Sequence, residues 1–345
     1  MQSNSSVDIF KVWIGLAAFV IIVGGIKLAA SLLIPILLAI FIATVAYPII
    51  EWLEKIGIHK ILAFLIVLLM VVLILSIFGY IILSSVDGFV NNIPLYTKRV
   101  YALLDSSKSL LGNFGIDFNI EEIKRLLDLE SAVVFLSDLL KALSKVLSKS
   151  LLIFLAVMFI LFDLPNLKAK IKLLSKDKNS NHFELFSYKL NKYLFLKTII
   201  SLATGLLIGV GLYFLGVDFA PLLGLIAFLL NYIPAIGSII AAIPAIVVAL
   251  AGADPFIAIW VIILYLAVNI TFGNILEPKV MGEGLGLSVL VVFLSLLFWG
   301  WVFGSVGMFL AVPLTMTIKL ALEQHPKTKI FAFMLGSYKG KEPFK

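Results

Sequence analysis

Residues 222–250 read LLGLIAFLLNYIPAIGSIIAAIPAIVVAL, two apolar runs separated by the turn at 231–237. Each run is too short to cross alone a hydrocarbon core about 30 Å thick, which needs roughly 20 apolar residues in a helix. Helices break at membrane depth only where protein or water satisfies the freed backbone groups, because each unsatisfied group costs several kcal/mol in hydrocarbon. The stretch therefore predicts a helical hairpin or one kinked span, with a polar point inside the membrane.

The sequence after this stretch repeats the same pattern of apolar runs and breaks. An apolar run at 256–270 leads into a short polar turn, 274–286, which contains a proline and three glycines. The next run, 287–320, is too long for one crossing and has a natural bend at 299–304, where the sequence reads WGWVFG. Broken helices around a polar turn indicate a pathway for a hydrophilic substance.

The composition of the whole chain places it in a membrane. Apolar residues make up 62% of the 345 residues and charged residues 14%, against roughly 25% charged residues in globular domains. Further apolar runs cover 12–30, 32–50, 61–83, 146–164 and 198–215. The sequence predicts an all-α, polytopic membrane protein with about 8–10 membrane-embedded helices, including broken or re-entrant helical hairpins.

The distribution of charge predicts an orientation and a division of the chain. Residues 165–197 carry eight lysines against two acidic residues, whereas 86–149 carries eight basic and eight acidic residues. Because cytoplasmic loops are enriched in lysine and arginine, we expect the first segment inside the cell and the second outside, with both termini cytoplasmic. The predicted units are N-terminal spans (1–85), an extracytoplasmic insert (86–149), a span with a basic loop (150–197), a C-terminal bundle (198–320) and a tail (321–345).

The insert at 86–149 has apolar residues at three- and four-residue steps in both of its halves. This spacing predicts two amphipathic helices joined near 111–115. Their apolar stripes must be buried against each other, against a neighbouring subunit or against the membrane surface. We favour packing between subunits, because about sixty residues are few for an independent core.

The polar turn at 274–286 holds the most informative ionisable residues. Glu277 lies between apolar runs, with Pro278 next to it and Lys279 two residues away. If the turn reaches into the protein, this carboxylate and ammonium must be paired or hydrated. The alternative is a cytoplasmic loop whose charges are solvated. Pro278 forces Glu277 away from helical geometry, and the glycines that begin at Gly282 allow positive backbone angles, so the turn is sharply shaped.

Glycines four residues apart mark close helix packing in the C-terminal half. Small residues at this spacing let two helices approach closely in lipid. We predict this role for Gly205, Gly209, Gly300, Gly304 and Gly307.

Several classes of function are excluded by motifs that the sequence lacks. There is no cysteine, so thiolate metal sites and cysteine nucleophiles are excluded. The patterns GxxxxGK[ST], HExxH and GxSxG do not occur, and the three histidines lie in separate loops. An enzyme is therefore disfavoured. No basic run is interleaved with aromatic residues, which disfavours nucleic acid as a partner. We expect no cofactor and no metal.

Three segments together carry a family resemblance. They are 231–237, 274–288 and the glycine-to-proline segment 304–313, and they resemble the signature of the AI-2E family of predicted permeases over nearly the whole chain. This resemblance implies export of a small polar solute such as autoinducer-2, or exchange of monovalent cations for protons, across a bacterial inner membrane. It also implies a homo-oligomer surrounded by membrane lipids.

The leading hypothesis is therefore a secondary permease. Its predicted pathway residues are Asn231, Pro234, Gly237, Asn274, Glu277, Pro278, Lys279 and Gly282. In this hypothesis the prolines break helices, Asn231 and exposed carbonyls provide ligands, and Glu277 titrates or pairs. The alternative is a membrane scaffold that organises partners through the 86–149 insert, which leaves the shaped turn at 274–286 without a purpose.

Overall fold

The computed structural model describes residues 4–112, 138, 140–174, 180–234, 236–252, 254–277, 279, 287–323 and 328–336. These residues form helices and short connections, with one isolated bridge between Leu287 and Gly336. Within them, six helices are long and apolar enough to cross a membrane, and three shorter apolar helices accompany them. The prediction of an all-α, polytopic membrane protein is confirmed.

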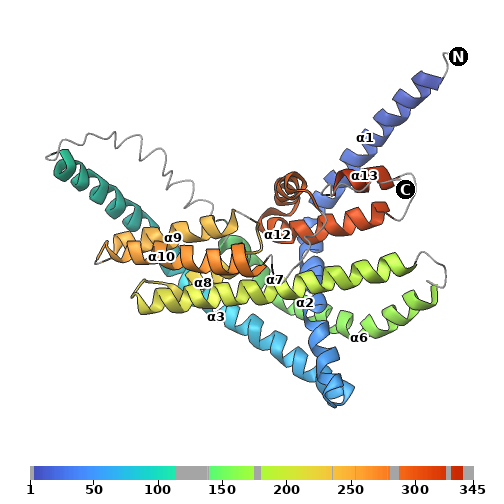
Figure 1. Ribbon diagram of the computed structural model, residues 1–345, viewed down its shortest axis with the longest axis horizontal. Coiled ribbons are helices and arrows are strands. Elements are labelled where there is room, and N and C mark those ends of the chain that lie inside the picture. Colours follow the sequence, from blue (N-terminus) through green and yellow to red (C-terminus); the bar gives the residue numbers. More distant parts are fainter. Residues whose placement is uncertain are drawn as a thin grey trace.

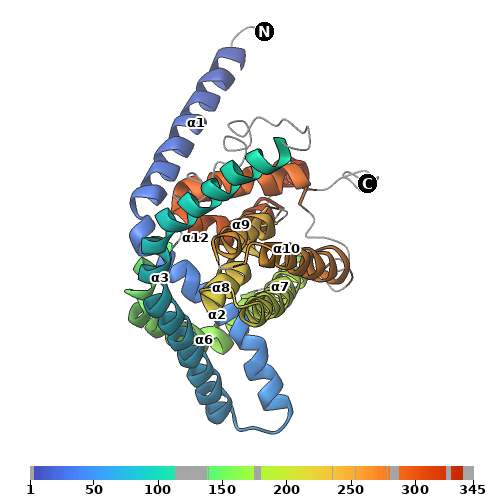
Figure 2. The same ribbon diagram turned by 90° about the vertical axis from the view of Figure 1, so that its left-hand side faces the viewer.

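The apolar runs at 12–30 and 32–50 do not fold into a hairpin. Helix α1 (Asn4–Leu28) and helix α2 (Ala30–Lys55) are separated by a break at Ala29 alone. Helix α1 projects away from the body in both views and does not fold back along α2 (Figures 1 and 2). A break of one residue changes the direction of the chain but leaves no room for a connecting loop.

Helix α3 (Lys60–Gly112) has 53 residues and joins a predicted span to the first part of the predicted insert. The second half of α3, residues 86–112, is its outer half, and it is not separate from the other helices of the bundle. Phe89, Tyr96 and Val100 are buried in one cluster with residues of the C-terminal half. The apolar stripe that we expected to face a neighbouring subunit is, at Phe89 and Val100, buried within the chain.

Polar contacts hold the outer half of α3 against two connecting loops. The Tyr96 hydroxyl donates to Asp218 Oδ2 at 3.4 Å, and Arg99 Nη1 donates to the carbonyl of Ala251 at 2.8 Å. Burial, and then the neighbouring Asp218 carboxylate, raise the pKa of Tyr96. The Phe89 and Phe219 rings meet edge to face, 5.6 Å apart. The loops that contain Asp218 and follow Ala251 therefore lie on the same side of the molecule as the outer half of α3.

Helix α6 (Ser150–Leu174) packs with α2 and the first part of α3 in a cluster of its own. Helix α2 contributes small side chains at three- and four-residue steps, Ala39, Ala43 and Ala46. Small residues let neighbouring helices approach closely where lipid provides no hydrophobic drive for association.

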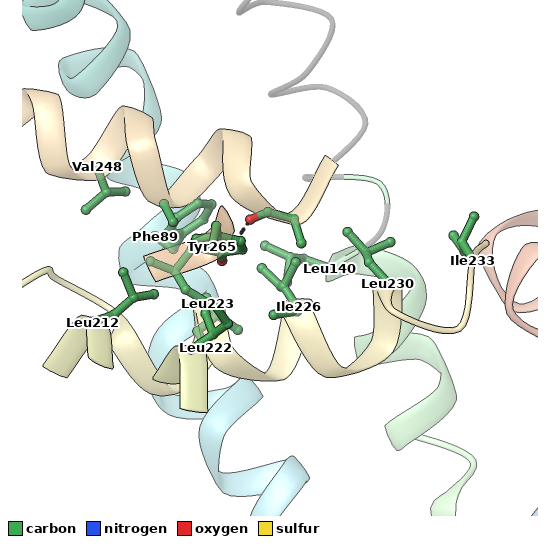
Figure 3. Packing of buried hydrophobic residues seen from close by; sticks show 14 of the residues in the cluster. Phe89, Leu140, Leu212, Leu222, Leu223, Ile226, Leu230, Ile233, Val248 and Tyr265 are labelled. Carbon is green, nitrogen blue, oxygen red and sulfur yellow. Dashed lines mark hydrogen bonds between the residues drawn. The ribbon is translucent and has the colours of Figure 1, made fainter. Parts of the chain in front are cut away.

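Helices α8 (Ala220–Leu230) and α9 (Gly237–Ala251) form a helical hairpin rather than one kinked span (Figure 3). Helix α8 has 11 residues, so at 1.5 Å per residue it is about 16 Å long and cannot cross a core of about 30 Å. Its neighbour is the long helix α7 (Ser180–Phe214), which contains the span Leu190–Phe214. The hairpin is thus an inserted element beside a complete span.

The last part of the chain forms a second hairpin, which consists of the two halves of one bent helix, α12. Helix α10 (Ile257–Val268) continues as a π-helix, η1 (Asn269–Leu276). Helix α12 (Val289–Glu323) then bends back on itself at Gly304, where φ is +66°. Trp299 Nε1 donates across the bend to Thr315 Oγ1 at 3.0 Å. A short helix, α13 (Lys329–Met334), follows.

The two hairpins contact different parts of α7. Helix α8 follows the Phe214 end of α7 after a short loop. Leu287, just before α12, and Met316, in its second half, instead share a cluster with Tyr193 and Leu194, near the start of the span Leu190–Phe214. The tip of the α8–α9 hairpin contacts Thr198 and Ser201, in the middle part of α7.

Candidate functional site

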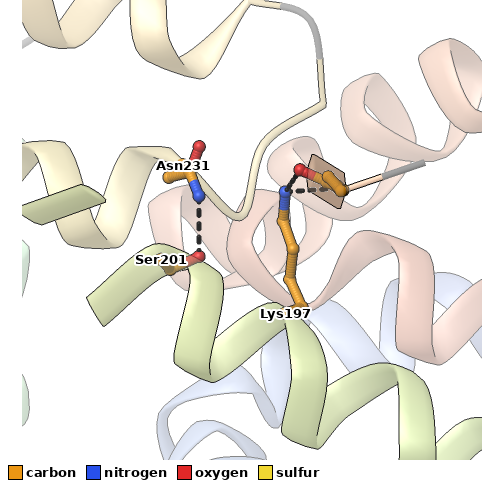
Figure 4. Close-up of polar contacts among 4 residues, drawn as sticks. Lys197, Ser201 and Asn231 are labelled. Carbon is orange, nitrogen blue, oxygen red and sulfur yellow. Dashed lines mark hydrogen bonds and ion pairs between the residues drawn. The ribbon is translucent and has the colours of Figure 1, made fainter. Parts of the chain in front are cut away.

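A buried ion pair lies where these broken elements meet. Lys197 Nζ contacts both carboxylate oxygens of Glu277, at 2.7 and 2.8 Å (Figure 4). The Lys197 side chain is 3% exposed and the Glu277 side chain 23%. Lysine and glutamate are almost never fully buried unless they are paired, so each charge here depends on the other.

A second polar contact lies one helical turn further along α7. Asn231 Nδ2, at the end of α8, donates to Ser201 Oγ at 2.9 Å, and both residues are buried (Figure 4). The neighbouring Tyr232 hydroxyl donates to Thr198 Oγ1 at 2.7 Å. The hairpin tip is thus attached to α7 by two side-chain hydrogen bonds.

Three polar residues form a stripe along α7. Lys197, Ser201 and Thr204 are separated by four and three residues, the spacing that places side chains on one face of a helix. Thr204 Oγ1 is a buried polar atom without a hydrogen-bond partner among the described residues. Most buried polar atoms in proteins have a partner, so this hydroxyl, one helical turn beyond Ser201, is an exception on the stripe.

Aromatic rings cover the other side of the hairpin tip. The Tyr232 ring lies 4.3 Å from that of Phe309 and 5.7 Å from those of Phe41 and Phe228. These rings come from α2, α8 and the second half of α12, so three elements converge on Tyr232. In this conformation the Tyr232 ring is packed among aromatic side chains of these elements.

Local sequence explains why the polar groups come together. Helix α8 ends after Leu230, and the turn at 231–237 presents Asn231 and Tyr232 to α7. At the other side, the π-helical stretch η1 precedes Glu277. A π-helix places successive side chains at a different angle from an α-helix and is frequent at functional sites. Two irregular elements thus direct polar side chains at one regular helix.

The structure gathers some of the predicted pathway residues and separates others. Asn231 and Glu277 both contact α7, and Gly237 is buried at the hairpin turn, where a Cβ would collide with the carbonyl of Leu230. Pro234 is half-buried in the same turn, whereas Asn274 and Lys279 are exposed. The partner of Glu277 is therefore Lys197 and not the nearby Lys279. Pro278 and Gly282 lie outside the described residues.

The predicted packing glycines have different surroundings. A Cβ on Gly205 would lie 2.6 Å from Phe228 Cβ and 2.8 Å from the Gly224 carbonyl oxygen, and a Cβ on Gly209 would lie 3.4 Å from Gly224 Cα. Helices α7 and α8 are therefore in backbone contact here. Across the α12 bend, Gly300 faces Met308 and Gly307 faces the Trp299 carbonyl.

Gly304 differs from the other packing candidates. A Cβ there would meet nothing within 4 Å, and its φ is +66°. Its role is to permit the bend, because side chains other than glycine rarely adopt this backbone conformation.

Sequence reasoning missed Lys197, Ser201 and Thr204. Lys197 was counted as the last lysine of a cytoplasmic loop, although a long apolar run follows it directly. The signal that could have found these residues is their three- and four-residue spacing within a predicted span, which aligns polar side chains on one face.

Comparisons with known proteins agree on one family. The family model for the AI-2E family transporter matches residues 16–327. The chain is 38% identical over 328 residues to the "AI-2 transport protein TqsA" of Escherichia coli K12, which covers 94% of this chain and 95% of that protein. It is 34% identical over 323 residues to the "Putative transport protein YhhT" of the same organism, which covers 93% of each chain.

Proposed function

This chain belongs to the AI-2E transporter family, and we propose that it moves a small, neutral, polar solute past the point where the α8–α9 hairpin meets α7. Its family, and the six membrane-length helices among the residues that the structure describes, make it a multi-pass membrane transport protein and not an enzyme. The observation that carries the proposed route is the buried Lys197–Glu277 pair beside Asn231 and Ser201.

The energetics of the pair support a functional role. Removing two charges from water is expensive, and replacing a buried ion pair with apolar residues of similar volume is often neutral or stabilising. A fold alone therefore gains little from Lys197 and Glu277. Ionisable residues inside membrane proteins more often mark the path of a substrate or a proton.

The same groups can bind a neutral solute when the pair opens. The Lys197 ammonium can only donate hydrogen bonds, and the Glu277 carboxylate can only accept them. Together they suit a molecule with both a carbonyl or ether oxygen and a hydroxyl. Asn231, Ser201 and Thr204 add further donors and acceptors on the same face of α7.

The architecture supports alternating access through movement of the hairpins. Secondary transporters commonly bind their substrate near the bilayer midplane at discontinuous helices, and one bundle moves against another around that site. Here the α8–α9 hairpin is attached to α7 by side-chain hydrogen bonds that can break and re-form. The aromatic rings around Tyr232 would serve as the barrier on one side.

One observation favours a neutral solute over a monovalent cation. The Lys197 ammonium lies against the only carboxylate that we place in the route, so it opposes the entry of a second cation. Because the relative TqsA is named for AI-2 transport, autoinducer-2 is the first solute to test. The proposal includes outward movement across a bacterial inner membrane, both termini in the cytoplasm and assembly with further copies of the chain.

The decisive experiment compares transport with folding in variants of the pair. Purified protein is reconstituted into vesicles, and flux of autoinducer-2 is measured beside flux of sodium, lithium and protons. Lys197→Met and Glu277→Gln are each expected to abolish solute flux. Each single variant should also lower the free energy of unfolding by about 3–5 kcal/mol, because an unpaired buried charge remains.

The double variant Lys197→Met/Glu277→Gln separates the two effects. It removes both charges, so stability should recover while flux stays lost. Lys279→Met is the matched control, because this exposed lysine should change neither property. Normal flux in the double variant would contradict the proposed route. If the unmodified protein moved a cation but no solute, the proposed substrate would have to be a cation. A scaffold would give no flux of any probe in the unmodified protein.

A further inference from the structure

The C-terminal segment Thr328–Gly336 folds back onto the start of α12. The backbone N–H of Ser288 donates to the carbonyl of Leu335 at 3.1 Å, and Leu287 and Gly336 form an antiparallel bridge. Ser288 is also the N-cap of α12, because its hydroxyl accepts from the N–H of Val291 at 3.2 Å. A segment from the end of the described chain thus completes the hydrogen bonding at the start of this helix.

This contact lies next to the ion pair. Leu287 and Tyr193 are buried in one cluster, against which Leu335 packs. Tyr193 precedes Lys197 by four residues on α7, so the two share a helix face, and Tyr193 lies within electrostatic reach of Glu277. The cluster around Tyr193 therefore connects the C-terminal segment to the Lys197–Glu277 pair.

The attachment of this segment is slight. Helix α13 has six residues, of which Ala332 is buried. Its larger apolar side chains Ile330, Phe331, Phe333 and Met334 are all exposed. Segments with few buried apolar contacts open at low free-energy cost. A contact that joins α12 to the cluster around Tyr193, yet can detach easily, has the properties of a regulatory element.

We propose that Thr328–Gly336 is an autoinhibitory strap that must release Leu287 and Ser288 before the Lys197–Glu277 pair can separate, a role that rests on the proposed function of that pair. While the strap is attached, it holds the start of α12 against the Tyr193 end of α7. Its release frees these two elements to move apart. The position of the strap then sets the rate of transport.

A reversible crosslink tests this proposal directly, because the chain contains no cysteine. Leu287 and Gly336 form a non-hydrogen-bonded antiparallel pair, in which Cα atoms are about 4.5 Å apart, within the range of about 4.4–6.8 Å that disulfides span. Oxidation of Leu287→Cys/Gly336→Cys should reduce flux at least about tenfold, and reduction should restore it. The single variants Leu287→Cys and Gly336→Cys control for the effect of each substitution and of the oxidant.

A second measurement does not depend on transport. Amide hydrogen exchange at Tyr193 to Lys197 and at Glu277 should slow in the oxidised double variant, because local opening of these segments requires release of the strap. Leu335→Ala, which loosens the strap without a crosslink, should accelerate both exchange and flux. Unchanged flux and unchanged exchange after complete crosslinking would overturn the proposal. Slower exchange in a protein that moves no solute would support the strap and remove the proposed function.

Discussion

At the residue scale, the central feature is a helix face that combines paired and unpaired polar groups. Lys197 and Ser201 have partners in the residues directly after η1 and α8, whereas Thr204 has none among the residues that the structure describes. An unpaired buried hydroxyl destabilises the state in which it is unpaired. If a solute supplies the missing partner, the unpaired hydroxyl lowers the stability of the solute-free protein and raises its affinity for the solute.

This difference between paired and unpaired hydroxyls predicts opposite effects on stability for two similar substitutions on α7. Thr204→Val removes a hydroxyl that has no partner, so it should stabilise the protein by up to about 1 kcal/mol and weaken solute binding. Thr198→Val removes the group that accepts from Tyr232, so it should destabilise the protein by a similar amount. Thermal unfolding in detergent and the concentration dependence of flux measure both effects. A Thr204→Val variant with unchanged solute affinity would remove Thr204 from the binding site.

At the element scale, the position of the polar stripe depends on how closely α7 and α8 approach. Gly205 and Gly224 bring the two backbones together, and the tip of the hairpin follows at Asn231. A wider separation would move the Asn231 amide away from Ser201. The glycines therefore act on the site without containing any functional group.

We expect Gly205→Ala to destabilise the protein by about 1–3 kcal/mol, because the added Cβ meets backbone atoms that cannot rotate away. Flux should fall more than stability explains, since the Asn231–Ser201 hydrogen bond is lengthened. Gly15→Ala is the matched control, because a Cβ there meets nothing within 4 Å. It should be neutral or slightly stabilising, as alanine favours helix over glycine. Thermal unfolding and vesicle flux of the two variants would show whether the contact is as close as described.

At the scale of the whole molecule, α7 is contacted by both hairpins at different points along its length. The outer half of α3 is tied to the loops at the base of the α8–α9 hairpin. The C-terminal segment is tied to the base of α12. Each hairpin base thus has its own tether, and any movement of a hairpin must strain or release one of them.

This arrangement makes a prediction about membrane sidedness. Single cysteines at Ser107 and Ser180, introduced into the thiol-free chain, should react with an impermeant reagent from opposite sides, because α6 crosses the membrane between them. A cysteine in place of the exposed Asp254 should react from the same side as Ser107, since Arg99 bonds the end of α9. Labelling of all three positions from one side would contradict the placement of the hairpin bases.

Much of the fold follows from local sequence. The spans follow from uninterrupted apolar runs, and the two hairpins follow from the polar residues, proline and glycine at 231–237 and from the glycines at 299–304. The extent of α3 does not follow in the same way. The apolar run ends near residue 83, yet the helix continues to Gly112 through Pro94. Burial of Phe89 and Tyr96 against the C-terminal half stabilises that extension. A contact between segments far apart in the chain cannot be predicted from the local sequence of either one.

The sequence by itself determined that this protein lies in a membrane, that its helices break near 231–237, 274–286 and 299–304, and that Asn231 and Glu277 lie at two of these breaks. These are properties of local hydrophobicity and backbone geometry, which each segment carries alone. Only the tertiary structure decided that Glu277 pairs with Lys197, eighty residues away in sequence, and not with Lys279. The partner of a buried charge is set by which helices pack together, and packing depends on the whole chain.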